Sequence, residues 1–239
     1  MRITCIGHSG FAVESADGGT TLIFDFYIDP TGVVDGLLSR AQNVYVFVSH
    51  SHRDHLCHDI FAWRDRYPIK RYVIANECRR KLMRSMPLDR WPMTFASQGR
   101  RWTDGIISVQ TFGSTDVGVS FMVDFDGRRL FHAGDYTCWH FSEENDVQSV
   151  KKAQGDFHAI LRDIANYAPH VDVAMMPVVP NIGGDFAYGA REFLKAVKCD
   201  LFLPMHTWGR DREAAQFLLY QNPAHGNCRL LQAGESIEM

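Results

Sequence analysis

The stretch His50-Ser51-His52-Arg53-Asp54-His55 places four side chains that can bind a metal ion within six residues. Imidazole nitrogens together with a carboxylate suit zinc, and they also suit iron or manganese. A tight turn can direct alternate side chains at one ion and the next pair at another, so the spacing suggests a site for two ions. Chance clustering on a solvated turn is the alternative, but it would pack three imidazoles and a carboxylate together with no partner to offset repulsion or desolvation.

The residues directly before this stretch predict where it lies. Positions 44–48 form a nearly continuous apolar run rich in β-branched residues. This is the pattern of a strand that is covered on both faces. We therefore expect the candidate ligands to lie at the carboxyl end of a buried strand.

Strand-like and helix-like segments alternate along the rest of the chain. Strands are expected at 2–6, 11–14, 21–26, 71–75, 106–111, 119–125, 129–132, 171–176 and 201–204, and helices at 77–86, about 142–166 and 187–197. Each half runs from β-rich to helix-containing segments, which predicts an α/β fold with two facing mixed sheets and helices outside. No linker, low-complexity tract or repeat of an identical motif is visible, so a single domain over residues 1–239 is expected.

The composition narrows the class of partner. With 239 residues, 46% of them apolar, the chain can bury a large core. Basic and acidic side chains are nearly balanced, 25 against 28, so there is no electrostatic footprint for nucleic acid or an anionic membrane. A small-molecule substrate fits better, and the oligomeric state is left open. The amino terminus lacks a signal-peptide pattern and no apolar run could span a bilayer, so a cytoplasmic location is expected.

Several motifs in order along the chain resemble one known family. The HxHxDH pattern at residues 50–55 is the signature of the metallo-β-lactamase fold. GHSGFAVE at residues 7–14 and LIFDFY at residues 22–27 look like the opening of the branch that contains ascorbate-6-phosphate lactonase and similar metal-dependent hydrolases. LFHAGDY at residues 130–136 and LPMHTWG at residues 203–209 resemble its later metal motifs. The combination is far more specific than any one motif.

This resemblance implies an αββα sandwich with a metal centre at its edge. Carried over position by position, it implies that His50 and His52 bind the first ion, that Asp54, His55 and His206 bind the second, and that Asp135 bridges the two. Zinc is the expected metal, as one or two ions, with manganese or iron as alternatives.

One loop departs from the family pattern. The family usually supplies a third histidine to the first ion from the loop before the strand at 119–125, but residues 112–118 contain no histidine. Asp116 is the one residue there that could replace this donor well, directly or through water. The alternative is that Ser114 and Asp116 only cap the turn, which would leave the first site weak, empty or altered in metal preference.

Residues near these motifs are candidates for proton transfer. Asp54 or Asp135 would orient the attacking hydroxide, and His140, His8 or Tyr136 would protonate the leaving group. For His8, a buried histidine bonded to backbone is the competing interpretation. Trp139 and Trp208 are expected either to contact substrate or to pack in the core.

Together these features predict a hydrolase that attacks a small ester, lactone or phosphoester with a metal-bound hydroxide. A lactone is favoured because the branch resemblance points that way. One alternative is a phosphodiesterase or nuclease, although the charge balance argues against long nucleic acid. The other is a non-catalytic single-metal sensor or a degenerate family member, because the third histidine is missing.

Overall fold

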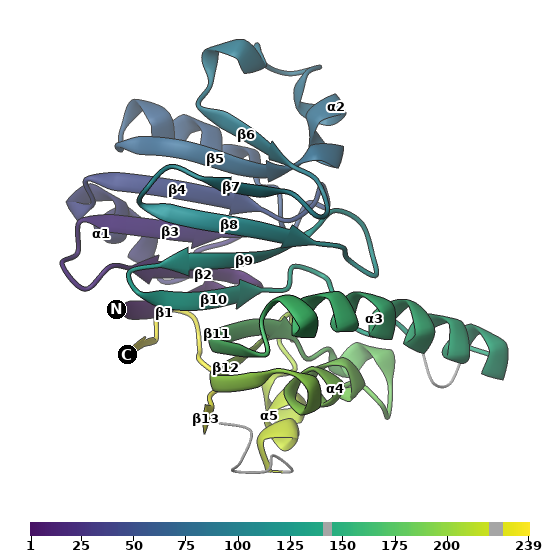
Figure 1. Ribbon diagram of the computed structural model, residues 1–239. Coiled ribbons are helices and arrows are strands. Elements are labelled where there is room, and N and C mark those ends of the chain that lie inside the picture. The colour runs from purple at the N-terminus through teal and green to yellow at the C-terminus, as the bar shows by residue number, and fades with distance from the viewer. Residues whose placement is uncertain (141–144, 220–226) are drawn as a thin grey trace. The chain divides into compact units, whose positions relative to one another are not determined.

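The computed structural model describes residues 1–140, 145–219 and 227–239 (Figure 1). They form two compact units, each built on one seven-stranded mixed sheet. The first unit comprises residues 1–100, 117–119 and 231–239, and the second comprises residues 101–116 and 120–230. The α/β class with two mixed sheets and helices is therefore confirmed. The extent of a single domain stays a prediction.

The first sheet has the strand order β14-β1-β2-β3-β4-β5-β6. Its strands are β1 (Arg2–Gly7), β2 (Gly10–Glu14), β3 (Thr20–Phe24), β4 (Asn43–Val48), β5 (Ile69–Ala75), β6 (Met93–Ala96) and β14 (Ser236–Glu238). Pairing is antiparallel from β14 to β3 and parallel from β3 to β6. The helical segments are α1 (Val33–Arg40), η1 (His58–Asp65), η2 (Asn76–Cys78), α2 (Arg79–Leu82) and η3 (Leu88–Arg90).

Strand β4 explains how the histidine-rich stretch is positioned. Residues 44–48 are fully buried, as expected for a strand between two parallel neighbours. Parallel pairing aligns the carboxyl ends of β3, β4 and β5, so the segments that follow these three strands lie at one edge of the sheet. The candidate ligands after β4 lie at this edge, as predicted.

The second sheet has the strand order β13-β12-β11-β10-β9-β8-β7. Its strands are β7 (Arg101–Thr103), β8 (Ile107–Phe112), β9 (Ser120–Phe125), β10 (Arg128–His132), β11 (His170–Pro177), β12 (Lys198–Met205) and β13 (Asn227–Cys228). Pairing is antiparallel from β7 to β10 and parallel from β10 to β13. The helical segments are α3 (Val147–Tyr167), η4 (Pro180–Ile182), α4 (Tyr188–Ala196) and α5 (Asp211–Leu219).

Helix α3 shows the local rules that set its ends. Asp146 caps its amino terminus, where the carboxylate accepts the Ser149 amide at 2.7 Å. The helix buries Phe157, Leu161 and Ile164, which share one face. It ends before Ala168-Pro169, because the residue before a proline disfavours the helical conformation. Residues 142–144, with which this helix was predicted to begin, lie outside the described residues.

Other predictions need correction. The helix expected at 77–86 is a 3₁₀ turn, η2, followed by the short α2. Single turns continue after it, but Pro87 limits the length of any helix here. The sequence patterns did not reveal the helices α1 and α5 or the short strands β6, β7, β13 and β14.

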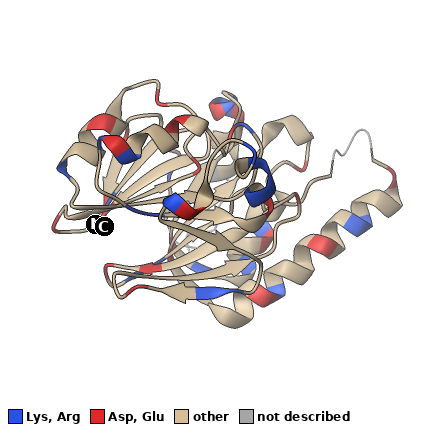
Figure 2. Ribbon diagram, turned by 90° about the horizontal axis from the view of Figure 1, so that it is seen from above, with Lys and Arg blue, Asp and Glu red and all other residues tan. Residues whose placement is uncertain are grey.

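The surface chemistry is mixed. Figure 2 shows basic and acidic residues interspersed along the helices and loops of the described chain. Within that described part, no helix is long and apolar enough to cross a membrane.

Candidate metal centre

His50 and His52 follow β4 in the first unit and face one another. His50 Nε2 lies 3.0 Å from His52 Nδ1, and the ring centroids are 4.7 Å apart. His50 is fully buried, whereas His52 is exposed. Two imidazole nitrogens this close either share a proton or aim at a common cation. The pair therefore has the geometry of two ligands that enter from one turn.

Asp54 connects two further histidines of the first unit. Its Oδ2 lies 3.1 Å from His8 Nε2 and 3.5 Å from His55 Nε2. His8 comes from the turn between β1 and β2, where its φ of 55° aims the side chain from a left-handed backbone. Donor atoms of these three residues lie within 4.8 Å of one another. The structure thus brings His8 to the carboxylate instead of leaving it bonded only to backbone.

Asp25 lies within the LIFDFY motif, but no role in the site was predicted for it from the sequence. It is fully buried directly after β3, with a φ of 40°. Its carboxylate accepts the Ser49 amide at 2.7 Å and the Ser49 hydroxyl, and it lies 2.8 Å from His55 Nδ1. Metal-binding histidines commonly give their second nitrogen to such a carboxylate, which fixes tautomer and orientation. Asp25 therefore holds His55 with Nε2 turned toward Asp54.

Ser49 extends this supporting layer to the other histidine pair. Its hydroxyl lies 3.0 Å from His50 Nδ1 while it donates to Asp25. A hydroxyl can accept from one partner and donate to another. Both buried histidines of the stretch are therefore oriented from behind by one linked set of side chains.

Gly118 lies against the start of the same stretch. An added Cβ at Gly118 would lie 2.0 Å from the Ser49 carbonyl oxygen and 2.7 Å from His50 Cβ, and the backbone φ is 80°. Val119 then donates its amide to the Ser49 carbonyl at 3.0 Å. Only glycine fits this approach.

In the second unit, Asp135 and His206 follow the carboxyl ends of the two strands that flank β11. Asp135 follows β10 and His206 follows β12; both are buried, and Asp135 Oδ1 lies 3.2 Å from His206 Nε2. Carboxylate oxygens of Asp116 and Asp135 lie within 4.8 Å of one another. The Ser114 hydroxyl also accepts the Asp116 amide at 3.2 Å, so the turn cap that was the alternative for this loop is present too.

Two tryptophans flank His206. The ring centroid of Trp139 lies 6.0 Å from that of His206, and the centroid of Trp208 lies 5.5 Å from it, both edge-on. Trp139 also donates its indole N–H to the Asp135 carbonyl at 2.8 Å. His206 and Trp208 have φ values of 61° and 53°, a conformation that costs free energy at non-glycine residues. Trp208 stays 49% exposed, so it is not part of the core.

The two remaining proton-transfer candidates are enclosed. Tyr136 is fully buried, stacks on Phe157 and donates its hydroxyl to the Phe157 carbonyl at 3.0 Å. Burial raises the pKa of the Tyr136 phenol well above its usual range. This position favours a packing role for Tyr136 over proton transfer. His140 is also buried, with Nδ1 3.3 Å from Cys138 Sγ and Nε2 3.5 Å from Asp185 Oδ2.

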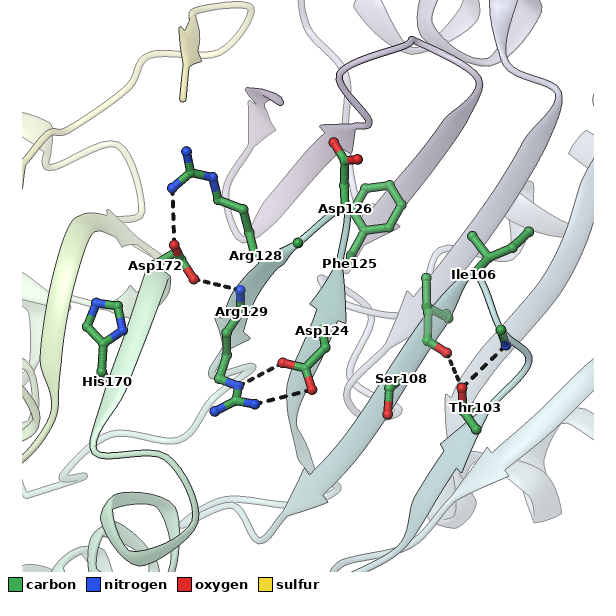
Figure 3. A pocket seen from close by; sticks show the side chains of 13 residues that line it. Thr103, Ile106, Ser108, Asp124, Phe125, Asp126, Arg128, Arg129, His170 and Asp172 are labelled. Atoms are coloured by element: carbon green, nitrogen blue, oxygen red, sulfur yellow. Dashed lines mark hydrogen bonds and ion pairs between the residues drawn. The ribbon is translucent and has the colours of Figure 1, made fainter.

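A pocket of about 560 Å³ in the second unit lies away from these donors (Figure 3). Its walls include the β9–β10 turn and the amino ends of β10 and β11, whereas Asp135 follows the carboxyl end of β10. Its arginines are already paired, Arg128 with Asp172 at 3.1 Å and Arg129 with Asp124 at 2.7 Å. This hollow therefore coincides with neither donor set.

The donor chemistry fits a transition-metal ion. The candidate donor atoms of each unit are imidazole nitrogens and carboxylate oxygens. In the first unit, His55 contacts a carboxylate and His50 a hydroxyl through the second ring nitrogen, as metal-binding histidines commonly do. This set suits zinc, manganese or iron better than a cation that prefers oxygen alone.

Comparison with known proteins agrees with this chemistry. No family model matches the chain. A UPF0173 metal-dependent hydrolase of Natranaerobius thermophilus is 26% identical over 251 residues, covering 100% of both chains. A second one, from Thermococcus kodakarensis, is 26% identical over 255 residues with the same coverage. The metallo-β-lactamase fold protein YhfI of Bacillus subtilis matches with a TM-score of 0.65 at 13% identity, over 99% of both chains.

The structural likeness bears on the fold and the sequence likeness on the type of protein. These findings confirm the metallo-β-lactamase fold and the expectation of a metal-dependent hydrolase, whereas the substrate, the metal and the lactonase-like branch stay proposals.

Proposed function

We propose that this chain hydrolyses a small ester, lactone or phosphoester with one or two bound zinc, manganese or iron ions. The supporting observation is the arrangement around Asp54, whose carboxylate faces His8 and His55 while Asp25 orients His55 from behind. A carboxylate between two histidines, with a second buried carboxylate behind one of them, is a costly arrangement that a cation would stabilise.

The proposed ligands are the residues of the sequence motifs. They are His50, His52, Asp54 and His55, which lie in the first unit, and Asp116, Asp135 and His206, which lie in the second. Support for including the second set is the sequence pattern together with the closeness of its members to each other. Asp116 would take the place of the histidine that the family pattern has in this loop.

A divalent ion bound there would lower the pKa of water and polarise the oxygen of the substrate. The residues of the chain would manage the protons and the orientation. Asp54 would accept a hydrogen bond from the attacking water and orient it. His8 lies in the β1–β2 turn, 3.1 Å from Asp54, and is placed to pass the proton of the attacking water on to the leaving group. Trp208 would exclude water from one side of His206.

The substrate class follows from chemistry common to these reactions. Esters, lactones and phosphoesters each present a polarisable oxygen and an electrophilic carbon or phosphorus atom to the attacking water. A lactone is our first choice, because the opening motifs at residues 7–14 and 22–27 resemble the lactonase-containing branch. A cytoplasmic location and a small-molecule substrate are part of the same proposal.

The test is hydrolysis of a panel that contains an aryl ester, a lactone and a bis-phosphodiester, by protein loaded with zinc or manganese. Wild type is expected to turn over at least one compound, and Asp54→Ala should lose roughly 10³-fold in rate or more. Asp59→Ala, an exposed carboxylate five positions further along, is the matched control and should keep the wild-type rate. Equal rates for Asp54→Ala and wild type would refute the role of this centre.

A further inference from the structure

The peptide groups around Ser51, which lies between two of the proposed ligands, are held from outside the metal centre. The Ser51 amide donates to Glu77 Oε1 at 2.6 Å, and the Ser51 carbonyl accepts from Lys81 Nζ at 2.8 Å. One short segment thus satisfies both backbone groups of this residue. Each bond has a charged side chain on one side, which makes it stronger than a neutral hydrogen bond.

The topology explains why this segment reaches Ser51. Strand β5 pairs in parallel with β4, and Val48 is in register with Ile74, so the residues after β5 lie beside the loop after β4. Glu77 lies in η2 and Lys81 in α2, and side chains four positions apart on helical backbone share a face. The acceptor and the donor are therefore presented together to one residue of the loop.

We propose that Glu77 and Lys81 are positioning residues that clamp Ser51 and thereby preorganise His50 and His52 for metal binding. The inference rests on the proposed function, since it assigns these histidines as ligands. Their facing nitrogens are 3.0 Å apart, a separation that depends on the backbone between them. A small rotation of the Ser51 peptides would move the two rings apart, and binding the ion would then have to restore the geometry.

Exposure distinguishes this clamp from a stabilising contact. Both Glu77 and Lys81 are exposed, so their contribution to the free energy of unfolding is small. Their removal is expected to change metal affinity while leaving thermal stability nearly unaltered. A general loss of structure would instead lower metal affinity and thermal stability together.

The experiment titrates metal-free protein with Zn²⁺ in competition with a chromophoric chelator. Glu77→Ala and Lys81→Ala should each weaken zinc binding about tenfold. Glu77→Gln keeps an acceptor oxygen and should recover most of the affinity. Arg80→Ala removes a neighbouring cation from the same segment and should bind zinc as wild type does.

A second measurement separates failure of the clamp from failure of the proposed function. Amide hydrogen exchange of Ser51 in metal-free protein should be faster in Glu77→Ala than in Arg80→Ala. Equal exchange rates, or zinc affinities of Glu77→Ala and Lys81→Ala equal to that of wild type, would overturn the clamp and leave the hydrolase proposal standing. Failure of wild type to bind any of the proposed metals would overturn that proposal, and with it the assigned purpose of the clamp.

Discussion

The sheets of the two units have the same strand arrangement but carry different side chains at equivalent strand ends. In the first sheet, β14 precedes an antiparallel set, β1 to β3, and a parallel set, β4 to β6; in the second, β7, β8 to β10 and β11 to β13 repeat this pattern. Of the first seven strands in the chain, β7 belongs to the second sheet, and of the last seven, β14 belongs to the first. The repeat is in the topology, since no identical sequence motif accompanies it.

Donor residues occur at corresponding places in the two sheets. His8 lies in the β1–β2 turn and Asp116 in the β8–β9 turn, while Asp25 follows β3 and Asp135 follows β10. The same two places, the turn after the first strand of the antiparallel set and the end of its last strand, therefore occur once in each sheet. We propose that the side chains decide whether a position becomes a ligand, as for Asp135, or a support behind a ligand, as for Asp25, which contacts His55.

The remaining strand ends show the largest difference. The first unit has the histidine-rich stretch after β4, whereas residues 178–184 after β11 contain no histidine, cysteine or acidic residue. The segment after β5 contributes Glu77, which accepts a hydrogen bond from the Ser51 amide, whereas the segment after β12 contributes His206. The first unit thus has four proposed ligands together with side chains that orient two of them, whereas the second unit has three proposed ligands. This difference predicts how variants in each unit behave.

The largest effect is expected from removing one ligand of each unit. His55→Ala and His206→Ala should each lose metal and roughly 10³-fold or more in hydrolysis, because a metal site missing one protein ligand binds and activates poorly. Metal content and turnover of the panel compounds are the measurements. His170→Ala, a half-exposed histidine paired with Asp200, is the control. Full metal content in His206→Ala would show that His206 is not a ligand.

A smaller loss is expected when the support behind His55 is weakened. Asp25→Asn keeps the shape but removes the charge that faces His55 Nδ1, so zinc affinity should fall by about 10- to 100-fold. The comparison with Asp135→Asn sharpens the distinction between support and ligand, because only the latter should change the number of ions bound per chain. If both variants lower the metal count equally, the assignment of Asp25 as a support is wrong.

Gly118 tests whether backbone packing sets the geometry of the first unit. Gly118→Ala adds a Cβ 2.0 Å from the Ser49 carbonyl oxygen on a backbone with φ of 80°, so it should cost about 2 kcal/mol or more in the free energy of unfolding. Gly127→Ala has a similar φ of 73° with no described atom near the added Cβ, and should cost only about 1 kcal/mol. Denaturant unfolding measures both. Equal losses would show that the contact with Ser49 is unimportant.

The smallest effect is expected at Tyr136. Tyr136→Phe removes the hydrogen bond to Phe157 and should cost about 1 kcal/mol in unfolding free energy while turnover stays at the wild-type rate. Thermal unfolding and the hydrolysis panel check the two parts. A large loss of turnover with unchanged stability would restore Tyr136 as the proton donor.

The fold was predictable where the pattern was strong. The apolar run at residues 44–48 predicted β4 because a strand between parallel neighbours needs apolar side chains on both faces. The patterns of β6 and β7 were too short to distinguish from loop. Helix α1 follows Gly32, which has no capping side chain, and its first amides donate instead to Asp29, outside the usual cap position. Local sequence does not contain the pairing partners that stabilise such segments.

The sequence indicated the proposed ligands and His8, but not the side chains that orient the ligands. The types and spacing of residues 50–55 are sufficient by themselves to indicate a metal centre. Asp25 was missed because residues 21–26 were predicted as one continuous strand, whereas β3 ends at Phe24 and the chain then turns. The roles of Glu77 and Gly118 depend on contacts with a loop that lies 26 or more positions away in sequence, which no local pattern encodes.

The most direct test of whether this chain holds a metal centre is the metal content of wild-type protein purified without added metal, measured by plasma mass spectrometry. We expect between one and two equivalents of zinc, manganese or iron per chain, and the loss of this metal in Asp54→Ala. A wild-type chain that contains none of these metals, and binds none when they are supplied, would contradict this expectation.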